Sequence, residues 1–406
     1  MAPPPPPPEL IDDAIAEILL RLPPDDPACF VRASLVCKLW RRILSNPTFP
    51  DRYREFHRTP PLLGFLGSNY SYCRASKVSR FDPITTRIPF LEPEFDCRAL
   101  DCRHGRVLFD MVGGTKGSLA VGDPITGDHK LLADPDPDPI SFYRSGVVLC
   151  AVDGCNHRGC HGGPFVVVFV STPSNNDGTK GTRAWVYSSE TAAWSSPASL
   201  QLPKGSSVYK KRGAHVGDQI YFLLTDTRIL KYDLGKHCLT TICLPAMYTN
   251  CHRGSLITMD DGSSLGFVVI EDSTLHLWAR KVNLDGSMAW VQDRVVLLNN
   301  LVPIIPTAHT HGLVNVIGFA EGVDILLLGE DASGYMFDLK SGQFKKLSNP
   351  EYHYYDVFPY LSFFIPVEAH CHQQWGLSDP GAIWKMECGP VHHYTMLMLL
   401  QCFVFR

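Results

Sequence analysis

The sequence predicts an α+β multidomain protein, in which a small domain of three helices precedes an all-β propeller of about six four-stranded blades. Helical periodicity is confined to residues 9–58, whereas short β-rich runs between Gly, Pro, Asp and Ser turns fill the chain from residue 59 onward. A related strand-and-turn unit recurs along this second part, which indicates a repeat architecture.

The first helix is predicted from a stripe of apolar residues that recur at i, i+3, i+4 and i+7 and therefore share one helix face. These residues are Ile15, Ile18, Leu19 and Leu22. Asp12 or Asp13 can cap the first turn, and Pro23 ends the helix because proline cannot continue the hydrogen-bond ladder.

Two further short helices are predicted. Asp26 can cap the second, with Pro27 at its first helical position and Phe30 among its apolar residues. The third carries Trp40 and ends at Asn46. Helices of this length are not stable alone in water, so they must share one small core. The stretch holds more apolar side chains than such a core covers, which indicates a protein partner.

This stretch resembles an F-box, through the segments Ile18–Leu19, Arg21–Pro23 and Val36–Arg41. Two departures keep the apolar bulk: Ile11 replaces the usual proline, and Cys29–Phe30 stands where aliphatic residues are usual. F-boxes dock on the Skp-type adaptor of cullin–RING ubiquitin ligases, so the resemblance implies that adaptor and, through it, the cullin and RING subunits as partners. The adaptor-binding residues it implies are Leu10, Ile15, Ile18, Leu19, Leu22, Pro23, Val36, Cys37 and Trp40.

The second part is predicted to be a propeller from its repeated unit. Residues 81–85 (Phe-Asp-Pro-Ile-Thr) return 41 residues later as 122–126, and related units occur at 186–190, 231–234 and 336–339. Four short strands in a period of forty-odd residues are typical of a propeller blade, whereas about 300 residues is long for the alternative, a β-sandwich. Tight hairpin turns are predicted at Glu321–Gly322, Ser333–Gly334 and Ser341–Gly342.

Four segments of this part resemble a large flowering-plant family of F-box proteins that carry an associated propeller: Cys102–Arg106, Asp123–Gly127, Val186–Thr191 and Ile317–Gly322. The resemblance implies a substrate-recognition subunit of a Skp–cullin–F-box ubiquitin ligase, with an unidentified target protein on the propeller and the transfer chemistry in other subunits. The predicted boundaries are a proline-rich tail at 1–8, an F-box at 9–58, the propeller at 59–367 and a divergent tail at 368–406. This divergent tail leaves it open whether the ring has its closing strand.

Composition excludes several classes. The net charge is −4 with 19% charged residues, and no basic stripe of the kind that binds nucleic acid is present. The longest apolar run, residues 396–405, is too short to span a bilayer, and the first ten residues do not read as a secretory signal. We expect a cytoplasmic or nuclear protein whose fourteen cysteines are free thiols, with no membrane or nucleic-acid partner.

Three segments could carry other functions. Residues 262–266 fit the G-x-S-x-G pattern around a nucleophilic Ser264, but a β-rich run follows where a hydrolase needs a helix. Residues 155–161 hold four possible zinc ligands, Cys155, His157, Cys160 and His161. Zinc ligands usually come as two separated pairs and no second pair is evident, so we expect a surface loop. The aromatic-rich segment 352–364 could line a recognition face, although part of it must be core.

We therefore expect a non-catalytic receptor with no metal, no cofactor and no catalytic residue. The alternative function is a propeller that senses a glycan or a small ligand and uses its F-box only for placement. An enzyme using Ser264 or a zinc site is the remaining alternative.

Overall fold

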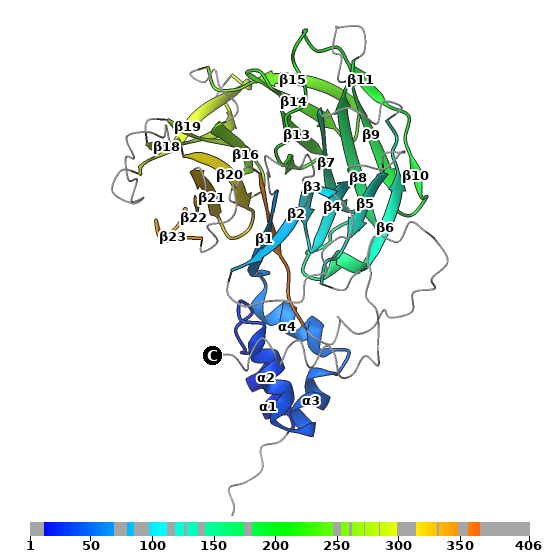
Figure 1. Ribbon diagram of the computed structural model, residues 1–406, viewed down its shortest axis with the longest axis vertical. Helices are drawn as coiled ribbons and strands as arrows, with labels where there is room; N and C mark the ends of the chain where they lie inside the picture. Colours follow the sequence, from blue (N-terminus) through cyan, green and yellow to red (C-terminus); the bar gives the residue numbers. More distant parts are fainter. Residues whose placement is uncertain are drawn as a thin grey trace, which may run out of the picture.

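The computed structural model describes residues 12–68, 79–84, 97–111, 118–125, 128–136, 143–173, 181–246, 253–259, 262–271, 273–283, 285–298, 314–330, 333–347 and 356–365. Helices lie at the N-terminal end of this part and strands form the rest (Figure 1). The tails predicted at 1–8 and 368–406, and Leu10, lie outside the described residues. None of the described helices has the length and the hydropathy that crossing a bilayer requires.

The three predicted helices are present, and a fourth that the sequence analysis did not anticipate follows them. The helices are α1 (Asp12–Leu19), α2 (Ala28–Val36), α3 (Lys38–Leu44) and α4 (Phe49–His57). Asp26 acts near the start of α2 as expected, since its carboxylate accepts a hydrogen bond from the Ala28 N–H at 3.2 Å. Cys37 has an extended backbone, which separates α2 from α3.

The strands form six antiparallel sheets, which are the six blades of the predicted propeller. Blade 1 consists of β3 (Cys97–Arg103), β4 (Arg106–Met111), β5 (Ser118–Gly122) and β6 (His129–Ala133). Blade 2 consists of β7 (Tyr143–Cys150), β8 (Phe165–Thr172), β9 (Thr182–Ser188), β10 (Ala193–Trp194) and β11 (Ala198–Leu200). Blade 3 consists of β12 (Ala214–Val216), β13 (Gln219–Leu223), β14 (Arg228–Asp233) and β15 (Cys238–Cys243).

Blade 4 consists of β16 (Gly254–Thr258), β17 (Leu265–Glu271), β18 (Thr274–Val282) and β19 (Met288–Leu297). Blade 5 consists of β20 (Asn315–Ala320), β21 (Ile325–Glu330), β22 (Ser333–Asp338) and β23 (Phe344–Lys346). Blade 6 combines β24 (Val357–Leu361) with β1 (Leu62–Ser68) and β2 (Ser79–Pro83). In each blade the first strand of the order given is the innermost, and inner strands contact one another at the blade pairs 6 and 1, 1 and 2, 3 and 4, 4 and 5, and 5 and 6.

In blades 1, 3 and 5 the repeated unit found in the sequence falls at the end of the third strand. Asp123, Asp233 and Asp338 occupy this position in blades 1, 3 and 5. The carboxylate of each accepts a hydrogen bond from a backbone N–H of the following turn, at 2.9, 2.9 and 2.7 Å respectively. An aspartate that fixes the turn to the fourth strand is therefore the physical reason for the repeat.

One of the three predicted hairpin turns is wrong. Glu321–Gly322 and Ser341–Gly342 lie in turns, where the two glycines adopt φ values of +84° and +70°. Ser333–Gly334 instead begins strand β22, and Gly334 pairs with Gly329 of β21. The error arises because a Ser-Gly pair is compatible with a strand start as well as with a turn.

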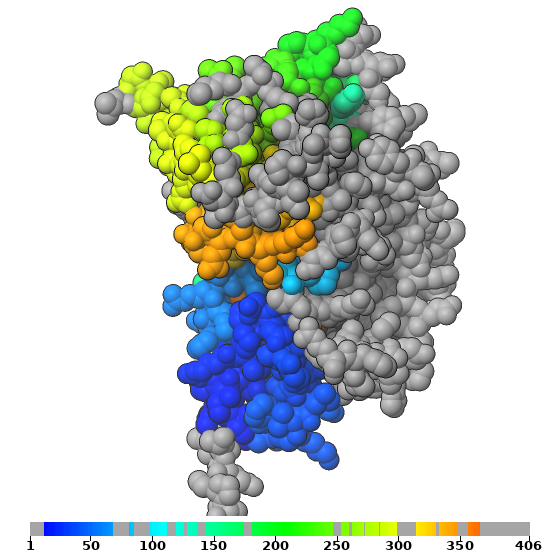
Figure 2. All heavy atoms as spheres, turned by 60° about the vertical axis from the view of Figure 1, so that its left-hand side comes forward, coloured from blue at the N-terminus to red at the C-terminus, as the bar shows by residue number. Residues whose placement is uncertain are grey.

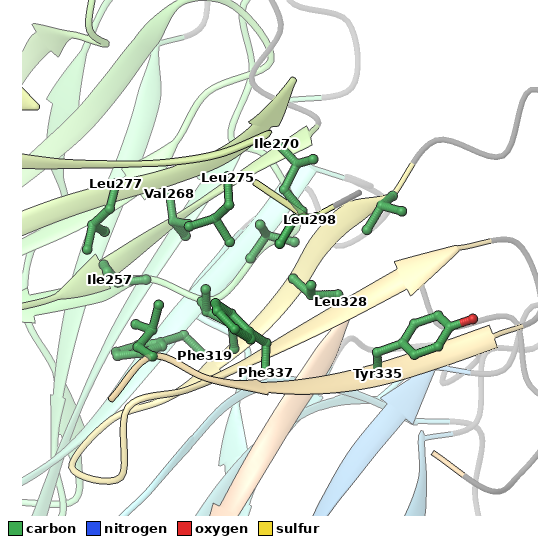
Figure 3. Close-up of a cluster of buried hydrophobic side chains, with 14 residues drawn as sticks. Ile257, Val268, Ile270, Leu275, Leu277, Leu298, Phe319, Leu328, Tyr335 and Phe337 are labelled. Atoms are coloured by element: carbon green, nitrogen blue, oxygen red, sulfur yellow. The ribbon is translucent and has the colours of Figure 1, made fainter. Parts of the chain in front are cut away.

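Each pair of neighbouring blades encloses its own apolar cluster. Figure 3 shows the cluster between blades 4 and 5, where Val268 and Leu277 face Phe319 and Phe337. The corresponding clusters fill the other five blade interfaces. A blade packed on both faces needs apolar residues at successive strand positions, which explains continuous runs such as β8, where all residues but Val166 are buried.

The ring is closed by a strand from each end of the propeller sequence. β24 pairs with β1 in antiparallel register, with Leu66 opposite Phe358 and Gly64 opposite Tyr360. The closing strand thus comes from residues that precede the divergent tail, and the question that this tail raised for ring closure is answered.

The segment that follows β24 leaves the ring and enters the helical domain, as Figure 1 shows beside α4. Phe363 and Ile365 are 4% and 1% exposed and belong to the same apolar cluster as Leu19, Phe30 and Tyr53. The rings of Tyr53 and Phe363 meet edge to face with centroids 5.9 Å apart. The two parts of the protein therefore share one core.

Phe363→Ala tests this shared core. The buried ring is lost and the helical domain has little else to fill the space, so we expect a loss of about 3–5 kcal/mol in the free energy of unfolding. Urea unfolding of the full chain measures it, with Phe56→Ala as the control because the Phe56 side chain is 46% exposed. Equal losses in the two variants would contradict a structural role for Phe363.

Candidate functional site

The helical domain exposes apolar side chains in spite of its filled core. Val36 is 61% exposed, Ile18 46% and Leu35 43%. Pro23 and Cys37 are exposed as well. We call these five residues the F-box apolar set. Figure 2 shows the helices, coloured blue, below the ring at one end of the molecule.

The residues predicted for adaptor binding divide into three groups. Ile18, Pro23, Val36 and Cys37 are exposed, as a direct contact requires. Leu22 and Trp40 are partly buried and pack against the domain core, so each has one face in the core and one toward solvent. Ile15 and Leu19 are 5% and 0% exposed, which gives them the role of holding the helices in place.

Leu35 is the one member of the set that the sequence analysis missed. It lies in α2, between the buried Ala33 and the exposed Val36. A residue two positions from a buried one lies on the opposite side of a helix. The available signal was therefore an apolar residue that does not fit the buried stripe of its own helix.

The core of the domain, more than its surface charges, holds the set in position. Phe30 and Tyr53 meet with ring centroids 4.9 Å apart, and the Tyr53 hydroxyl donates a hydrogen bond to the Leu22 carbonyl at 2.7 Å. The ion pair Arg42–Asp12 joins α3 to α1 at 2.6 Å, but both side chains are exposed. Exposed pairs contribute only about 0–1 kcal/mol.

The inner strands of the propeller are connected by a buried ion network. Asp101 of β3 accepts from Arg103 Nε and from Arg212 Nε, each at 2.9 Å. Glu321, just after β20, pairs with Arg103 Nη1 at 2.5 Å and with Arg212 Nη2 at 3.2 Å. Thr258 of β16 donates to Glu321 at 2.9 Å. The network therefore joins blades 1, 3, 4 and 5.

This network explains two of the family-like segments, which contain Arg103 and Glu321. Burial alone raises the pKa of the Glu321 carboxyl, but the guanidinium groups of Arg103 and Arg212 and the Thr258 hydroxyl outweigh it and bring the pKa to about 2. Glu321 is thus ionised at neutral pH, and Arg103 and Arg212 compensate its charge within the ring. A structural role accounts for these residues without a ligand.

A small space beside the network is lined by Lys211, Ser255 and Asp356 among others, and its volume is about 10 Å³. Lys211, which lines this space, donates hydrogen bonds from Nζ to the carbonyls of Gly254 and Val316, at 2.6 and 3.0 Å. A space of this size holds no more than one water molecule. This space is therefore too small for any larger ligand.

A groove at the rim between blades 3 and 4 has a suitable size. Its volume is about 470 Å³, and it is lined by Trp278, Arg280, Met288 and Trp290 together with residues 243–246. The Trp290 indole N–H donates to the Cys243 carbonyl at 2.9 Å, which joins the two blades across the groove. Trp, Met and Arg are the side chains that protein interfaces favour. We call this the rim groove.

The other candidate segments have clear positions. Ser264 lies in the turn that precedes strand β17, so the helix that a nucleophile elbow needs is replaced here by a strand, as expected. Residues 155–161 lie in the loop between β7 and β8, where His161 Nδ1 pairs with Asp123 at 2.7 Å. Of the aromatic segment, the described rings are buried: they are Phe358, Tyr360, Phe363 and Phe364. Tyr352, Tyr354 and Tyr355 lie outside the described residues.

Glu321→Gln tests the ion network through its pH dependence. Because the folded-state pKa of about 2 lies below the ordinary 4.5, the stabilisation is complete at neutral pH and is lost as the pH falls from about 5 toward 2. We expect the variant to lose about 3 kcal/mol near pH 7 and the difference from the natural chain to shrink on acidification. Thermal unfolding at a series of pH values measures this, and the exposed Glu190→Gln serves as the control. A difference that does not depend on pH would contradict the ionised state of Glu321.

Comparisons with known proteins match both parts of the chain. Residues 8–52 match the F-box domain, and residues 98–367 match the family described as F-box protein AT5G49610-like, beta-propeller. No curated protein matches the chain. Among solved structures, the crystal structure of TolB from Acinetobacter baumannii is similar with a TM-score of 0.38 and 11% identity, over 79% of this chain and 71% of that one. Because the propeller match alone spans more than half of the sequence, the chain belongs to the AT5G49610-like family of F-box proteins with a beta-propeller.

Proposed function

We propose that this protein is the substrate-recognition subunit of a Skp–cullin–F-box ubiquitin ligase. The F-box binds the Skp-type adaptor and, through it, the cullin and RING subunits, while the propeller binds a target protein. The chain itself performs no chemistry in this role and acts in the cytoplasm or the nucleus. The architecture of an F-box followed by a propeller supports the proposal.

The observation that carries the adaptor half is the F-box apolar set. A filled core removes any need for further apolar residues, yet Val36 and its neighbours Leu35 and Cys37 are exposed where α2 ends. Removing such a side chain from water contributes roughly 1.5–3 kcal/mol, which is the usual driving force for protein association. Trp40, partly exposed three residues beyond Cys37, supplies the aromatic anchor typical of an interface hot spot.

The mechanism is catalysis by proximity. A receptor that holds both the ligase and a target raises the local concentration of target lysines near the charged conjugating enzyme. This requires a defined distance between the two binding surfaces. Burial of Phe363 and Ile365 in the F-box core provides it, because the segment that closes the ring also completes the helical domain.

We assign target binding to the rim groove. Met288 is 49% exposed and stands beside two tryptophans and Arg280, and strand β19 continues from it with Val291, Val295 and Leu297 also exposed. Aromatic, Met and Arg side chains beside a strand that exposes several apolar residues suit a protein target better than a glycan or a small polar ligand, which needs convergent polar groups.

Val36→Glu tests adaptor binding with a matched control. A charge at this position must be desolvated on binding, so we expect the affinity of the full chain for purified Skp-type adaptor to fall by at least about 30-fold, or 2 kcal/mol. Val282→Glu makes the same change at a similarly exposed valine of the propeller, with 66% against 61% exposure, and should bind normally. Calorimetric titration measures both. Unaltered binding by Val36→Glu would remove the set from the interface.

Trp40→Ala should also weaken adaptor binding, by about 2 kcal/mol. Because Trp40 packs partly on the core, the free energy of unfolding of the variant must be measured together with its affinity for the adaptor. Weaker binding with an intact fold assigns Trp40 to the interface. Absence of any binding by the natural chain would refute the ligase proposal and leave the propeller to be studied as a ligand sensor.

Met288→Glu tests the rim groove. The ligase is reconstituted with adaptor, cullin, RING subunit and conjugating enzyme, and the proteins ubiquitinated in a cell extract are identified by mass spectrometry. We expect Met288→Glu to lose the products that depend on the natural receptor while adaptor binding is retained. Leu131→Glu is the control, since Leu131 of β6 in blade 1 is 48% exposed and Met288 is 49% exposed. Loss of the same products in both variants would place target binding elsewhere.

A further inference from the structure

The loop between β7 and β8 gathers four side chains of the types that bind metals. Cys150 is the last residue of β7, and Cys155, His157 and Cys160 follow within the loop. Their ligand atoms all lie within 4.8 Å of one another, and Cys160 Sγ lies 3.7 Å from His157 Nδ1. The ligands considered from the sequence included His161 and not Cys150, but His161 Nδ1 pairs with the Asp123 carboxylate.

These separations fit a tetrahedral zinc site. Zinc–sulfur bonds of about 2.3 Å and zinc–nitrogen bonds of about 2.0–2.1 Å place neighbouring ligand atoms roughly 3.5–3.8 Å apart. The separation of Cys160 and His157 already meets this, and none of the other distances between the ligand atoms has to shorten by more than about 1 Å. Rotation of these partly exposed side chains suffices for such a change. Three thiols and one imidazole are a closed, soft ligand set, which favours zinc over hard cations.

Groups around the four side chains are arranged for thiolates. The backbone N–H of Val152 points at Cys150 Sγ at 3.5 Å, and that of His157 points at Cys155 Sγ at 3.4 Å. Arg106 Nη1 lies 3.9 Å from Cys160 Sγ. Three thiolates with Zn²⁺ carry one net negative charge, and N–H donors and a nearby cation are what such a centre needs from its surroundings.

The backbone and the rings nearby also fix the position of His157. Its φ of +57° lies in the left-handed region, which a residue with a side chain rarely adopts without a reason. Its ring stacks on that of His104, with centroids 3.9 Å apart and planes 5° apart. The ring is thereby held with Nδ1 toward Cys160.

We propose that Cys150, Cys155, His157 and Cys160 bind one zinc ion as a structural site. The site requires reduced thiols, and all three cysteines are free. It departs from the expectation of a chain without metal, which depended on the apparent lack of further ligands. The proposal does not depend on the ligase function.

The position of the loop indicates what the ion does. Gly159 lies against the Arg54 side chain of α4, so closely that an added Cβ would stand 2.9 Å from Arg54 Nε. Arg106 of β4 donates to the Gly163 carbonyl at 2.7 Å and to that of Cys160. The loop is thus held between the F-box and blade 1. A zinc ion that orders it would fix the orientation of the F-box relative to the ring.

Metal content tests the site. The full chain purified under reducing conditions should contain one zinc per molecule by mass spectrometry of the elements. Cys150→Ser and Cys155→Ser should reduce this at least about fivefold, because each removes one of four ligands. Cys238→Ser and Cys243→Ser, which change cysteines outside the loop, should retain the full content. Zinc that persists in both loop variants would overturn the assignment.

Cobalt substitution keeps the test decisive if the loop variants fail to fold. Co²⁺ added to the metal-free natural chain should give the strong visible bands of tetrahedral cobalt and the near-ultraviolet band of sulfur-to-cobalt charge transfer, with one equivalent at saturation. A folded, reduced chain that shows neither band and contains no zinc would refute the proposal. So would a disulfide between two of the three cysteines in the protein isolated from a reducing compartment.

Hydrogen exchange tests the role of the ion in orienting the F-box. Removing zinc with a chelator should speed amide exchange in residues 151–164 and also in α4, through the contact of Gly159 with Arg54. The chelator should leave the exchange of Cys155→Ser unchanged. Faster exchange in the loop alone would contradict the orienting role.

Discussion

The pairing of β1 with β24 holds both parts of this protein together. It closes the ring, because the two strands come from opposite ends of the propeller sequence. It also carries the chain into the helical domain, where Phe363 and Ile365 complete a core that the helices alone leave open. The stability of the F-box and that of the propeller are therefore coupled, and the distance between their exposed surfaces is set by packing rather than by a linker.

The charged residues follow the same division between holding the ring and facing outward. Asp101, Arg103, Arg212 and Glu321 satisfy one another among the inner strands, where each charge is compensated, and the space beside Arg212 is only about 10 Å³. These residues can thus serve ring assembly, since a buried charge without its partner is costly. The two surfaces to which we assign binding, the F-box apolar set and the rim groove, lie at the periphery.

Features that depend on residues close together in the sequence, such as helices and turns, could be predicted from it. The first three helices follow from the spacing of apolar residues and prolines, and the repeat follows from an aspartate that fixes the same turn in blades 1, 3 and 5. Contacts between distant residues were not readable. No sequence pattern around Phe363 indicates that its ring packs against α2 and α4. Cys150 has the pattern of a strand residue, and only the fold shows that the loop brings His157 and Cys160 next to it. Leu35 was missed because the apolar stripe predicts only the residues on the buried side of the helix, and Leu35 is exposed.

The order in which the chain is synthesised gives the shared core a further meaning. Phe363 and Ile365 emerge from the ribosome some 300 residues after the helices whose core they complete. Almost the same number of residues is synthesised between β1 and its partner strand β24. A nascent or prematurely ended chain consequently has neither a finished ring nor a finished F-box. Only a chain that extends through its last strand can complete both the ring and the helical core.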